Sequence, residues 1–370
     1  MIKQISSLEL YFLLKEFEIL KDSRVDKVHH PQKNVLVFSF YKTNLGKKIL
    51  QIDIGKALFL IEEKENYEET LGFGMLLRKH IGGYFLYCIE QIKPERILKL
   101  SFKSKDNKKI LYIEFFGKGN AVLCDENNSI INSLEHHDFK SRAIRPKLNY
   151  IYPIMKYNFF ELSKEGLSDL LKNSKKESLV ACLAVELGLG GLYSEEICLL
   201  SCIGKNQAPK HIDERGIELI LSSIKQTLNK KISAQVIFKD DRLIDVAPFE
   251  LRFYDKYAKK NFQSFYQALE FFYSQFKEVK ESEFERKLRI LERIIEEQKL
   301  AIEELKKEEK ELRENGELIY HKYNLIKEIL EELNKAGKKY SWKEIKERLK
   351  GHKIIKEVND KDRKVLIEVG

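Results

Sequence analysis

The chain has 370 residues, of which 43% are hydrophobic and 34% charged, and its formal net charge is +9. This length accommodates about two to three domains, and the positive balance favours a polyanionic partner. The sequence contains no stretch of about 18 apolar residues and no signal-peptide apolar segment at its N-terminus. We therefore expect a cytoplasmic protein that does not enter a membrane.

The cysteine pattern predicts neither a disulfide framework nor a metal site. No two of the five cysteines form a CxxC pair. Cys198 and Cys202 share a helix face, but no further His or Cys pair completes a zinc set. We expect no metal, no cofactor and reduced cysteines in the core. They are Cys88, Cys124, Cys182, Cys198 and Cys202.

The first part of the chain is predicted to be mainly β. An amphipathic helix over 6–20 opens it, with Ser6 and Glu9 spaced as a capping box. We expect His29 and His30 to be loop residues, not ligands. Alternating apolar residues then predict strands at 34–41, 48–53, 57–61, 84–91, 96–102, 109–116, 121–125 and 129–133.

Residues 75–100 concentrate charge around one strand. A short helix carries the basic run Arg78, Lys79 and His80 and stops at the glycine pair 82–83, and Pro94 precedes the step Glu95-Arg96. Such an acid–arginine step can pair internally while presenting guanidinium donors to a phosphate. The alternative is a surface ion pair worth under about 1 kcal/mol.

Two further segments carry basic residues beside turns. Lys118 stands at the tip of the turn 117–120, where it either meets a phosphate or belongs to an ordinary β-turn. The turn lacks the spacing of a nucleotide-binding P-loop. Arg142 and Arg145 flank a strand end and either contact phosphate or brace the sheet.

From residue 160 the pattern is helical, with helices predicted at 163–172, 178–186, 194–201 and 211–229. The loop 187–191 between the second and third helices reads LGLGG, and Gly188, Gly190 and Gly191 would let backbone N–H groups approach a phosphate. The alternative is a tight interhelical turn without a ligand. Glu195 and Glu196 would cap the next helix and repel phosphate.

The last third of the chain returns to strand and then becomes a long helix. Strands are predicted at 232–238 and 243–248, followed by a helix at 261–273. A coiled-coil seam with 4,3 spacing follows. We expect Asn315-Gly316 to interrupt or bend that helix, and a short helix near 340–350 and a hairpin of 353–358 with 364–369 to end the chain. The seam residues are Phe284, Leu288, Leu291, Ile295, Gln298, Ile302, Leu305, Glu309 and Leu312.

The motifs of 76–97 resemble a known family. LLRKHIGG, then IEQ, then ERI are similar to the signature of the NFACT N-terminal domain of RqcH-type ribosome quality-control factors, once labelled fibronectin-binding proteins. The family usually has Asp-Arg where this chain has Glu95-Arg96. Its SALDL-like start, matched here by SSLEL, makes Glu9 the acidic position implicated in tRNA handling. GKGN followed by AVLCD, residues 142–153, and APFEL are further family landmarks.

The resemblance implies an α+β multidomain fold. Residues 1–158 would be a β-sandwich like that of formamidopyrimidine-type glycosylases, although Met1-Ile2 lacks the N-terminal proline of those enzymes. The long helix would be one arm of an intramolecular antiparallel pair, with homodimerisation as the generic alternative. The other expected parts are a helix–hairpin–helix domain (159–231), a return segment packing on the first domain (232–275), the coiled coil (276–336) and a partial α/β tip (337–370).

The resemblance also implies a function. The sequence contains no recognisable set of catalytic residues, so we expect no enzyme activity. The protein would bind the large ribosomal subunit carrying stalled peptidyl-tRNA and recruit tRNA, most simply alanyl-tRNA, for untemplated C-terminal tailing. Ribosomal RNA and stalk proteins would be its other partners. The alternatives are a DNA-binding or repair-related protein without glycosylase activity and a coiled-coil adhesin or structural protein. The implied RNA contacts are Glu9, Arg78, His80, Glu95, Arg96, Lys118, Arg142 and Arg145, with Gly188, Gly190 and Gly191 as a phosphate hairpin.

Overall fold

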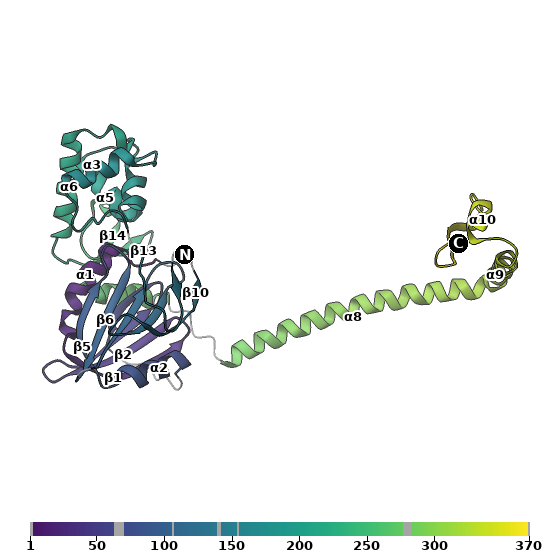
Figure 1. The fold of residues 1–370 in the computed structure, drawn as a ribbon, viewed down its shortest axis with the longest axis horizontal. Coiled ribbons are helices and arrows are strands. Elements are labelled where there is room, and N and C mark those ends of the chain that lie inside the picture. Colours follow the sequence, from purple (N-terminus) through teal and green to yellow (C-terminus); the bar gives the residue numbers. More distant parts are fainter. Residues whose placement is uncertain are drawn as a thin grey trace. The chain divides into compact units, whose positions relative to one another are not determined.

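The computed structural model describes residues 3–62, 70–105, 107–138, 142–153, 155–276 and 283–368 (Figure 1). The expectations for Met1, Ile2 and Val369 lie outside these residues. The chain forms two compact units, Met1–Lys277 and Glu278–Gly370, and each is described by itself.

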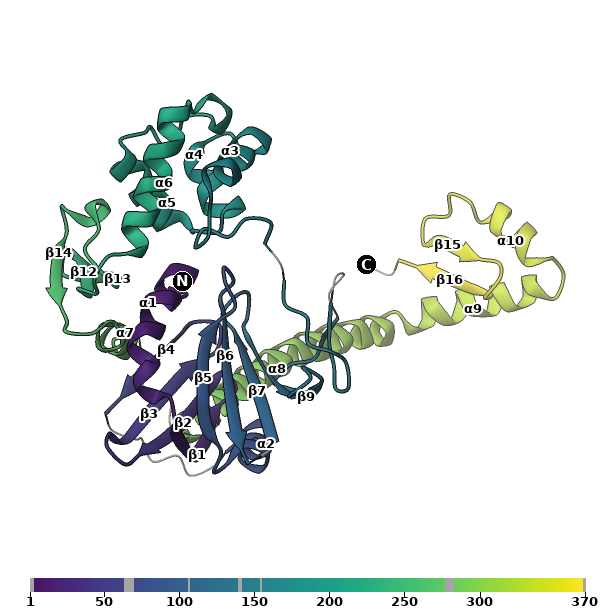
Figure 2. The same cartoon turned by 60° about the vertical axis from the view of Figure 1, so that its left-hand side comes forward.

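The first unit is built on one nine-stranded antiparallel sheet with the order β4-β3-β2-β1-β5-β6-β7-β8-β9 (Figure 2). Most of the predicted strands are present, with bounds shifted by one or two residues. The strands are β1 (Ser23–Gln32), β2 (Val35–Lys42), β3 (Gly46–Asp53), β4 (Ala57–Ile61), β5 (Phe85–Gln91), β6 (Ile97–Ser104), β7 (Asn107–Glu114), β8 (Asn120–Asp125) and β9 (Ile130–Ser133).

The sheet bends back on itself where its two halves join. Strands β1 and β5 pair only at Ser23–Leu86 and Arg24–Phe85. The rings of Phe38 in β2 and Phe102 in β6 have centroids 6.5 Å apart, although three strand spacings in a flat sheet would separate them by about 14 Å. The two halves therefore face each other over a shared apolar core, as the layers of a sandwich do.

Helices and a small second sheet enclose this core. Helix α1 (Ser7–Phe17) begins with the predicted capping box, in which Ser6 Oγ accepts from the Glu9 amide at 3.1 Å and Glu9 Oε2 accepts from the Ser6 amide at 2.8 Å. Glu16 of α1 accepts from the first amides of another helix, at 2.8 Å from the Phe265 N–H. The remaining elements around the core are α2 (Gly72–Ile81), α7 (Phe265–Ser274), β12 (Gln235–Lys239), β13 (Arg242–Ala247) and β14 (Ala258–Asn261), with the short pair β10 (His137–Asp138) and β11 (Ala143–Ile144) elsewhere.

The helical part of the first unit has its own apolar core. Helix α5 begins at Gly191, three residues before the predicted start, so Glu195 and Glu196 lie in its second turn. Glu196 is fully buried and accepts from the backbone amides of Arg252 and Phe253 at 3.1 and 3.0 Å. The elements are α3 (Lys164–Asn173), α4 (Leu179–Ala181), η2 (Cys182–Glu186), α5 (Gly191–Ser201), η3 (Pro209–His211) and α6 (Glu214–Leu228). The short helix η4 (Arg252–Tyr254) contributes Tyr254 to the same core, and η1 (Glu18–Leu20) lies outside it.

Two expectations about buried residues are wrong. His29 and His30 lie within strand β1, with only 6% and 2% of their surface exposed, because the strand continues through them to Gln32. Cys202 is exposed, since it follows the last residue of α5 in a left-handed conformation. Cys88, also expected in the core, is only partly buried, whereas Cys124, Cys182 and Cys198 are buried as expected.

The second unit begins with α8 (Glu283–His321), a helix of 39 residues. The expectation of an interruption at Asn315-Gly316 is wrong: α8 runs through both residues, and α9 (Tyr323–Gly337) begins only after Lys322. Helix α10 (Trp342–Arg348) starts with a capping box of Ser341 and Glu344. The predicted terminal hairpin is present as β15 (Ile355–Asn359) and β16 (Lys364–Ile367).

The long helix is present, but the coiled coil is not confirmed. Within the described ranges no second helix covers the seam of α8, and Leu291, Ile302 and Leu305 are 55%, 51% and 63% exposed. The side chain of Phe284 lies outside the described residues. Over the part of the chain that is described, no helix is both long enough and apolar enough to cross a membrane.

Candidate nucleic-acid interface

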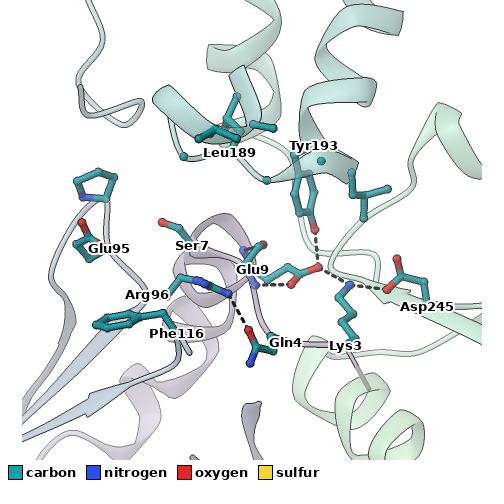
Figure 3. Close-up of a pocket in the computed structure, with 18 of the residues that line it drawn as sticks. Lys3, Gln4, Ser7, Glu9, Glu95, Arg96, Phe116, Leu189, Tyr193 and Asp245 are labelled. Carbon is teal, nitrogen blue, oxygen red and sulfur yellow. Dashed lines mark hydrogen bonds and ion pairs between the residues drawn. The ribbon is translucent and has the colours of Figure 1, made fainter. Parts of the chain in front are cut away.

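A cleft of about 830 Å³ lies between the sheet and the helical part of the first unit (Figure 3). Segments that are distant in sequence line it, among them the N-terminal residues with the start of α1, the turn before β6, the loop that opens α5, β13 and the end of α7. The predicted site residues Glu9, Glu95 and Arg96 line this cleft together with Gly188, Gly190 and Gly191.

The carboxylate of Glu9 forms the buried end of the cleft. Only 1% of its surface is exposed. Its Oε2 accepts from the Ser6 amide, while Oε1 accepts from Tyr193 Oη at 3.0 Å and lies 2.6 Å from Lys3 Nζ. Both oxygens are thus engaged within the protein (Figure 3).

Lys3 joins Glu9 to the second sheet. Its Nζ lies 2.5 Å from Asp245 Oδ1 and donates to the Val246 carbonyl. Burial disfavours the charged amine, but the two carboxylates outweigh burial and raise the pKa of Lys3. Burial, with the charge of Glu9 beside it, holds the pKa of Tyr193 well above its usual value, so Tyr193 remains a hydrogen-bond donor.

Gln91 fixes the turn that carries Glu95 and Arg96. Its Nε2 donates to the carbonyl and Oγ of Ser7, at 3.0 and 2.9 Å, and to the carbonyl of Glu95 at 2.9 Å. The turn closes with a bond from the Glu95 amide to the Ile92 carbonyl at 2.8 Å. The first turn of α1 and the Glu95-Arg96 step are therefore held in one position.

The predicted ion pair within the Glu95-Arg96 step is absent, because successive residues leave the turn in different directions. No Glu95–Arg96 contact falls among the ion pairs of the described residues, and Figure 3 shows the guanidinium directed toward Gln4 and away from Glu95. Arg96 Nη1 donates to Gln4 Oε1 at 3.4 Å. Burial lowers the pKa of Arg96 and raises that of Glu95, against the neighbouring charge in each case.

The glycine loop places the first turn of α5 at the cleft. Gly188 and Gly190 have φ of +79° and +77°, a region that side-chain-bearing residues rarely adopt. Leu189 is 2% exposed and packs into the helical core. Gly190 is the N-cap residue of α5 and provides no side-chain cap. The first backbone N–H groups of α5, which lie at the wall of the cleft, are therefore not paired by a side-chain cap.

Lys118 borders the cleft without lining it. It is exposed on the turn after β7, and the neighbouring Gly117 carbonyl accepts from Gln4 Nε2 at 3.0 Å. The turn packs tightly on the loop before β4, where a Cβ on Gly119 would lie 2.3 Å from the Gly55 nitrogen. Gln4 thus links this turn to Arg96.

Arg78 and His80 lie apart from the cleft, on α2. Arg78 Nε donates to the Val28 carbonyl at 2.5 Å and Nη2 donates to Thr70 Oγ1 at 2.7 Å, so its guanidinium ties α2 to β1. Burial lowers the pKa of His80, and Lys109 and Lys79 lower it further. His80 is therefore neutral at neutral pH.

Arg142 and Arg145 are both ion-paired. Arg142 is 7% exposed and binds Glu114 through two bonds, Nη1–Oε1 at 2.6 Å and Nη2–Oε2 at 3.1 Å. Arg145 pairs with Asp138 on the surface. Of the two interpretations left open by the sequence, bracing of the structure therefore applies to Arg142.

Sequence patterns did not predict Lys3, Gln4, Tyr193 or Asp245 as site residues, although all four line the cleft. Each contacts a partner far away in the chain, the Tyr193–Glu9 bond spanning 184 positions. Apolar side chains complete the lining, among them Val185, Ile244 and Phe276, which are 61%, 39% and 38% exposed. Over the described residues, no group of three His, Cys, Asp or Glu side chains is placed to hold a metal ion.

Comparison with known sequences gives related proteins along the whole chain. The archaeal Rqc2 homolog aRqcH of Methanocaldococcus jannaschii is 28% identical over 398 aligned positions, covering 99% of this chain and 58% of that protein. The Rqc2 homolog RqcH of Bacillus subtilis is 32% identical over 129 positions, covering 32% of this chain and 23% of that protein. The chain thus spans little more than half the length of the archaeal relative, and less of the bacterial one.

Two solved structures share the fold of the first unit. The fibrinogen-binding protein from Staphylococcus aureus superposes with a TM-score of 0.61 at 18% identity, covering 72% of this chain and 98% of that one. The N-terminal part of the fibronectin/fibrinogen-binding protein from Streptococcus suis gives 0.60 at 21% identity, covering 74% and 100%. At such identities the likeness concerns the fold alone.

A match to a protein family covers nearly the full length of the chain. It includes the motifs at 76–97, α1, the Glu95-Arg96 turn and the glycine loop. Residues 7–363 match the sequence profile of the NFACT N-terminal and middle domains. The chain belongs to this family.

Proposed function

We propose that this chain acts in ribosome-associated quality control and binds tRNA in the cleft between the sheet and the helical part. In this proposal the protein binds the large ribosomal subunit with stalled peptidyl-tRNA and recruits tRNA, most simply alanyl-tRNA, for untemplated tailing of the nascent chain. The names of the related proteins, Rqc2 and RqcH homologs, support the pathway. The peptide bonds would form in the ribosomal centre, so the chain itself needs no catalytic group.

The observation that carries the tRNA proposal is the convergence of residues on one cleft. Glu9, Glu95 and Arg96, together with the glycine loop, come from three separate stretches of sequence and line the same 830 Å³ space. An arginine beside the N-terminus of a helix is a suitable environment for a phosphate, because both supply N–H donors and positive potential. The exposed apolar residues of the lining offer contacts for a base or a ribose.

The residues of the cleft differ in role. Most of the N–H donors of Arg96 are available to a ligand. Within the described residues, its side chain makes one hydrogen bond, a long one to Gln4 Oε1. We assign it the direct RNA contact. Glu95, which is half-buried, is the candidate acceptor for a nucleotide N–H or hydroxyl group.

Glu9 is a positioning residue in this proposal. With 1% of its surface exposed and both oxygens engaged, it holds Tyr193 at the start of α5 against Lys3 and the first turn of α1. Its negative charge thereby keeps the wall that carries the glycine loop in place. Lys118 would add charge at the border of the cleft.

The decisive experiment is tRNA binding by the chain, wild type against Arg96→Ala, across a series of salt concentrations. Loss of a charge-assisted contact weakens binding by about 1–3 kcal/mol, and the affinity of both proteins falls as salt rises. Arg215→Ala is the matched control, because Arg215 is exposed on α6 and does not line the cleft. Equal affinities for wild type and Arg96→Ala would contradict the assignment of Arg96.

Two comparisons separate the proposal from its alternatives. A duplex DNA of equal length should bind more weakly than tRNA, and the reverse order would favour the DNA-binding alternative. Large ribosomal subunits that carry peptidyl-tRNA should retain the chain in a pelleting assay better than empty subunits do. Equal retention by the two kinds of subunit would contradict the role of the stalled peptidyl-tRNA.

A further inference from the structure

A row of six residues crosses the sheet at the end far from the cleft. Backbone pairing places them side by side on six successive strands, because Lys47 pairs with Tyr41, Tyr41 with Arg24, Arg24 with Phe85, Phe85 with Lys103, and Lys103 with Lys108. Directly paired residues of an antiparallel sheet point to the same face. The basic row therefore consists of Lys47, Tyr41, Arg24, Phe85, Lys103 and Lys108.

The basic row points away from the main core. The next residues along the strands, such as Phe40, Leu86 and Phe102, are buried in that core. Because side chains alternate across a sheet, the row occupies the opposite, outer face. All six side chains are exposed, and the two rings in particular: Tyr41 is 53% and Phe85 49% exposed.

The charge of the row is unbalanced. It contains four cations and no acid, and across the described residues none of the four takes part in an ion pair. Arg24, Tyr41 and Lys47 also line a hollow of about 260 Å³, in which Asp26 is the one acidic residue. A Cβ on Gly83 would lie 3.4 Å from Arg24 Nη2, so the guanidinium lies close to Gly83, which also lines this hollow.

From this arrangement we infer that the basic row is a second RNA-binding surface, which takes a single-stranded segment. Exposed aromatic rings on a sheet stack on unpaired bases, and interleaved cations follow the backbone phosphates. Duplexes bury their base faces and gain little from the rings. Five strand spacings of about 4.8 Å give the row a contour length of about 24 Å around the outside of the bend between β1 and β5, a path that a few nucleotides of flexible single strand can follow.

This surface is distinct from the cleft. Phe85 begins β5 and the Glu95-Arg96 turn follows its other end, so the length of the strand, about 20 Å, separates the two. Figure 2 shows β5, β6 and β7 side by side. The inference goes beyond the proposed function, since it would stand if tRNA did not bind in the cleft.

The test is fluorescence anisotropy of the whole chain with a 12-nucleotide oligo(U), which forms no base pairs. Loss of one stacked base weakens binding about 5- to 150-fold, so we expect this effect for Tyr41→Ala and for Phe85→Ala. Tyr41→Phe keeps the ring and should bind as wild type does. Thermal unfolding of each variant checks that it is folded, which the exposure of both rings predicts.

The salt dependence tests the cations. Four phosphate contacts give a slope of log K against log salt of about −3 for a single strand. Lys103→Ala combined with Lys108→Ala should reduce it to about −1.5. Lys239→Ala with Lys256→Ala removes the same charge from exposed positions outside the row and should leave the slope unchanged.

Three results would overturn the inference. The first is equal affinity of wild type and the ring variants for oligo(U). The second is binding of a 12-base-pair RNA duplex at the row with an affinity equal to or higher than that for oligo(U). The third is binding of poly-glutamate or anionic vesicles at the row without binding of oligo(U). Arg96→Ala distinguishes the two sites, since it should weaken tRNA binding in the cleft and leave oligo(U) binding unaffected. Failure of the row variants thus leaves the proposal for the cleft standing.

Discussion

Arg142 was a candidate RNA contact by sequence, and its geometry predicts a structural role that mutation can measure. Its guanidinium makes two bonds to Glu114 and a third to the Ile151 carbonyl at 3.2 Å, and Glu114 is 3% exposed. Replacing Arg142 with Met leaves the Glu114 carboxylate buried without its cation. Breaking such a pair typically costs about 3–5 kcal/mol.

The expected loss lies near the lower end of this range, about 3 kcal/mol, because Tyr150 Oη still donates to Glu114 Oε1 at 2.8 Å. For a unit of this size, 277 residues long, that corresponds to a fall in Tm of about 6–12 °C. The Arg142→Met/Glu114→Leu double variant should recover much of the loss, because an apolar pair replaces a buried ion pair at little net cost.

Urea unfolding followed by circular dichroism measures these differences in the free energy of unfolding. Arg142→Met within about 0.5 kcal/mol of wild type, or a double variant as unstable as the sum of the two single ones, would refute the assignment of a buried structural pair. Folded Arg142→Met should also keep its affinity for tRNA, in contrast to Arg96→Ala.

Other features of the structure yield further predictions. Lys3 has a raised pKa in the folded state, so the stability that its charge contributes is complete below the unfolded pKa of 10.5 and is lost as pH rises through the folded pKa. In urea unfolding, the difference in the free energy of unfolding between wild type and Lys3→Met should therefore disappear only above pH 10.5. Tyr193→Phe should cost about 1–3 kcal/mol of stability, because the buried Glu9 loses a donor, and a cost near zero in the same assay would contradict this. Leu291→Glu should leave the melting of the first unit unchanged, since Leu291 is 55% exposed on α8; a lower sedimentation coefficient would instead show that the seam holds a partner helix. Cys202 should be the fastest cysteine to react with iodoacetamide, because burial raises the pKa of other thiols; mass spectrometry would contradict this if a buried thiol reacted first. Those thiols are Cys124, with a pKa of about 12, and Cys182 and Cys198, each about 11.

Local patterns were sufficient to predict most elements of this chain. The capping boxes at Ser6 and Ser341 and the alternation along β2 to β9 depend on neighbours within a few positions, which the sequence displays directly. Strand β1 (Ser23–Gln32) was missed, since charged residues interrupt its alternation and the pair His29-His30 is polar although both side chains are buried. The apolar 4,3 spacing of α8 correctly predicted a helix, but spacing alone does not determine whether another helix covers the seam.

The candidate site was only partly predictable, for a different physical reason. Glu95 and Arg96 were found because they are adjacent, yet adjacency suggested an ion pair that the turn does not form. Lys3, Tyr193 and Asp245 were missed because they contact groups far away in the chain, 243 positions in the case of Lys3 and the Val246 carbonyl. Such contacts follow from the tertiary fold, and one sequence contains no local sign of them.

These remote contacts bear on how the cleft keeps its shape. Glu9 and Lys3 join α1, the start of α5 and β13 through bonds among buried or partly buried groups. Separating any two of these elements would leave a charged group without its partner. Gln91 adds the turn of Arg96 to the same assembly through Ser7. Because α1 is thereby attached to the start of α5, to β13 and to the turn of Arg96, a ligand that contacts both Arg96 and the first turn of α5 meets them at a separation fixed before binding. Preorganisation of this kind lowers the entropy cost of binding, and in the proposed function it is how a residue as buried as Glu9 would affect a ligand that it does not touch.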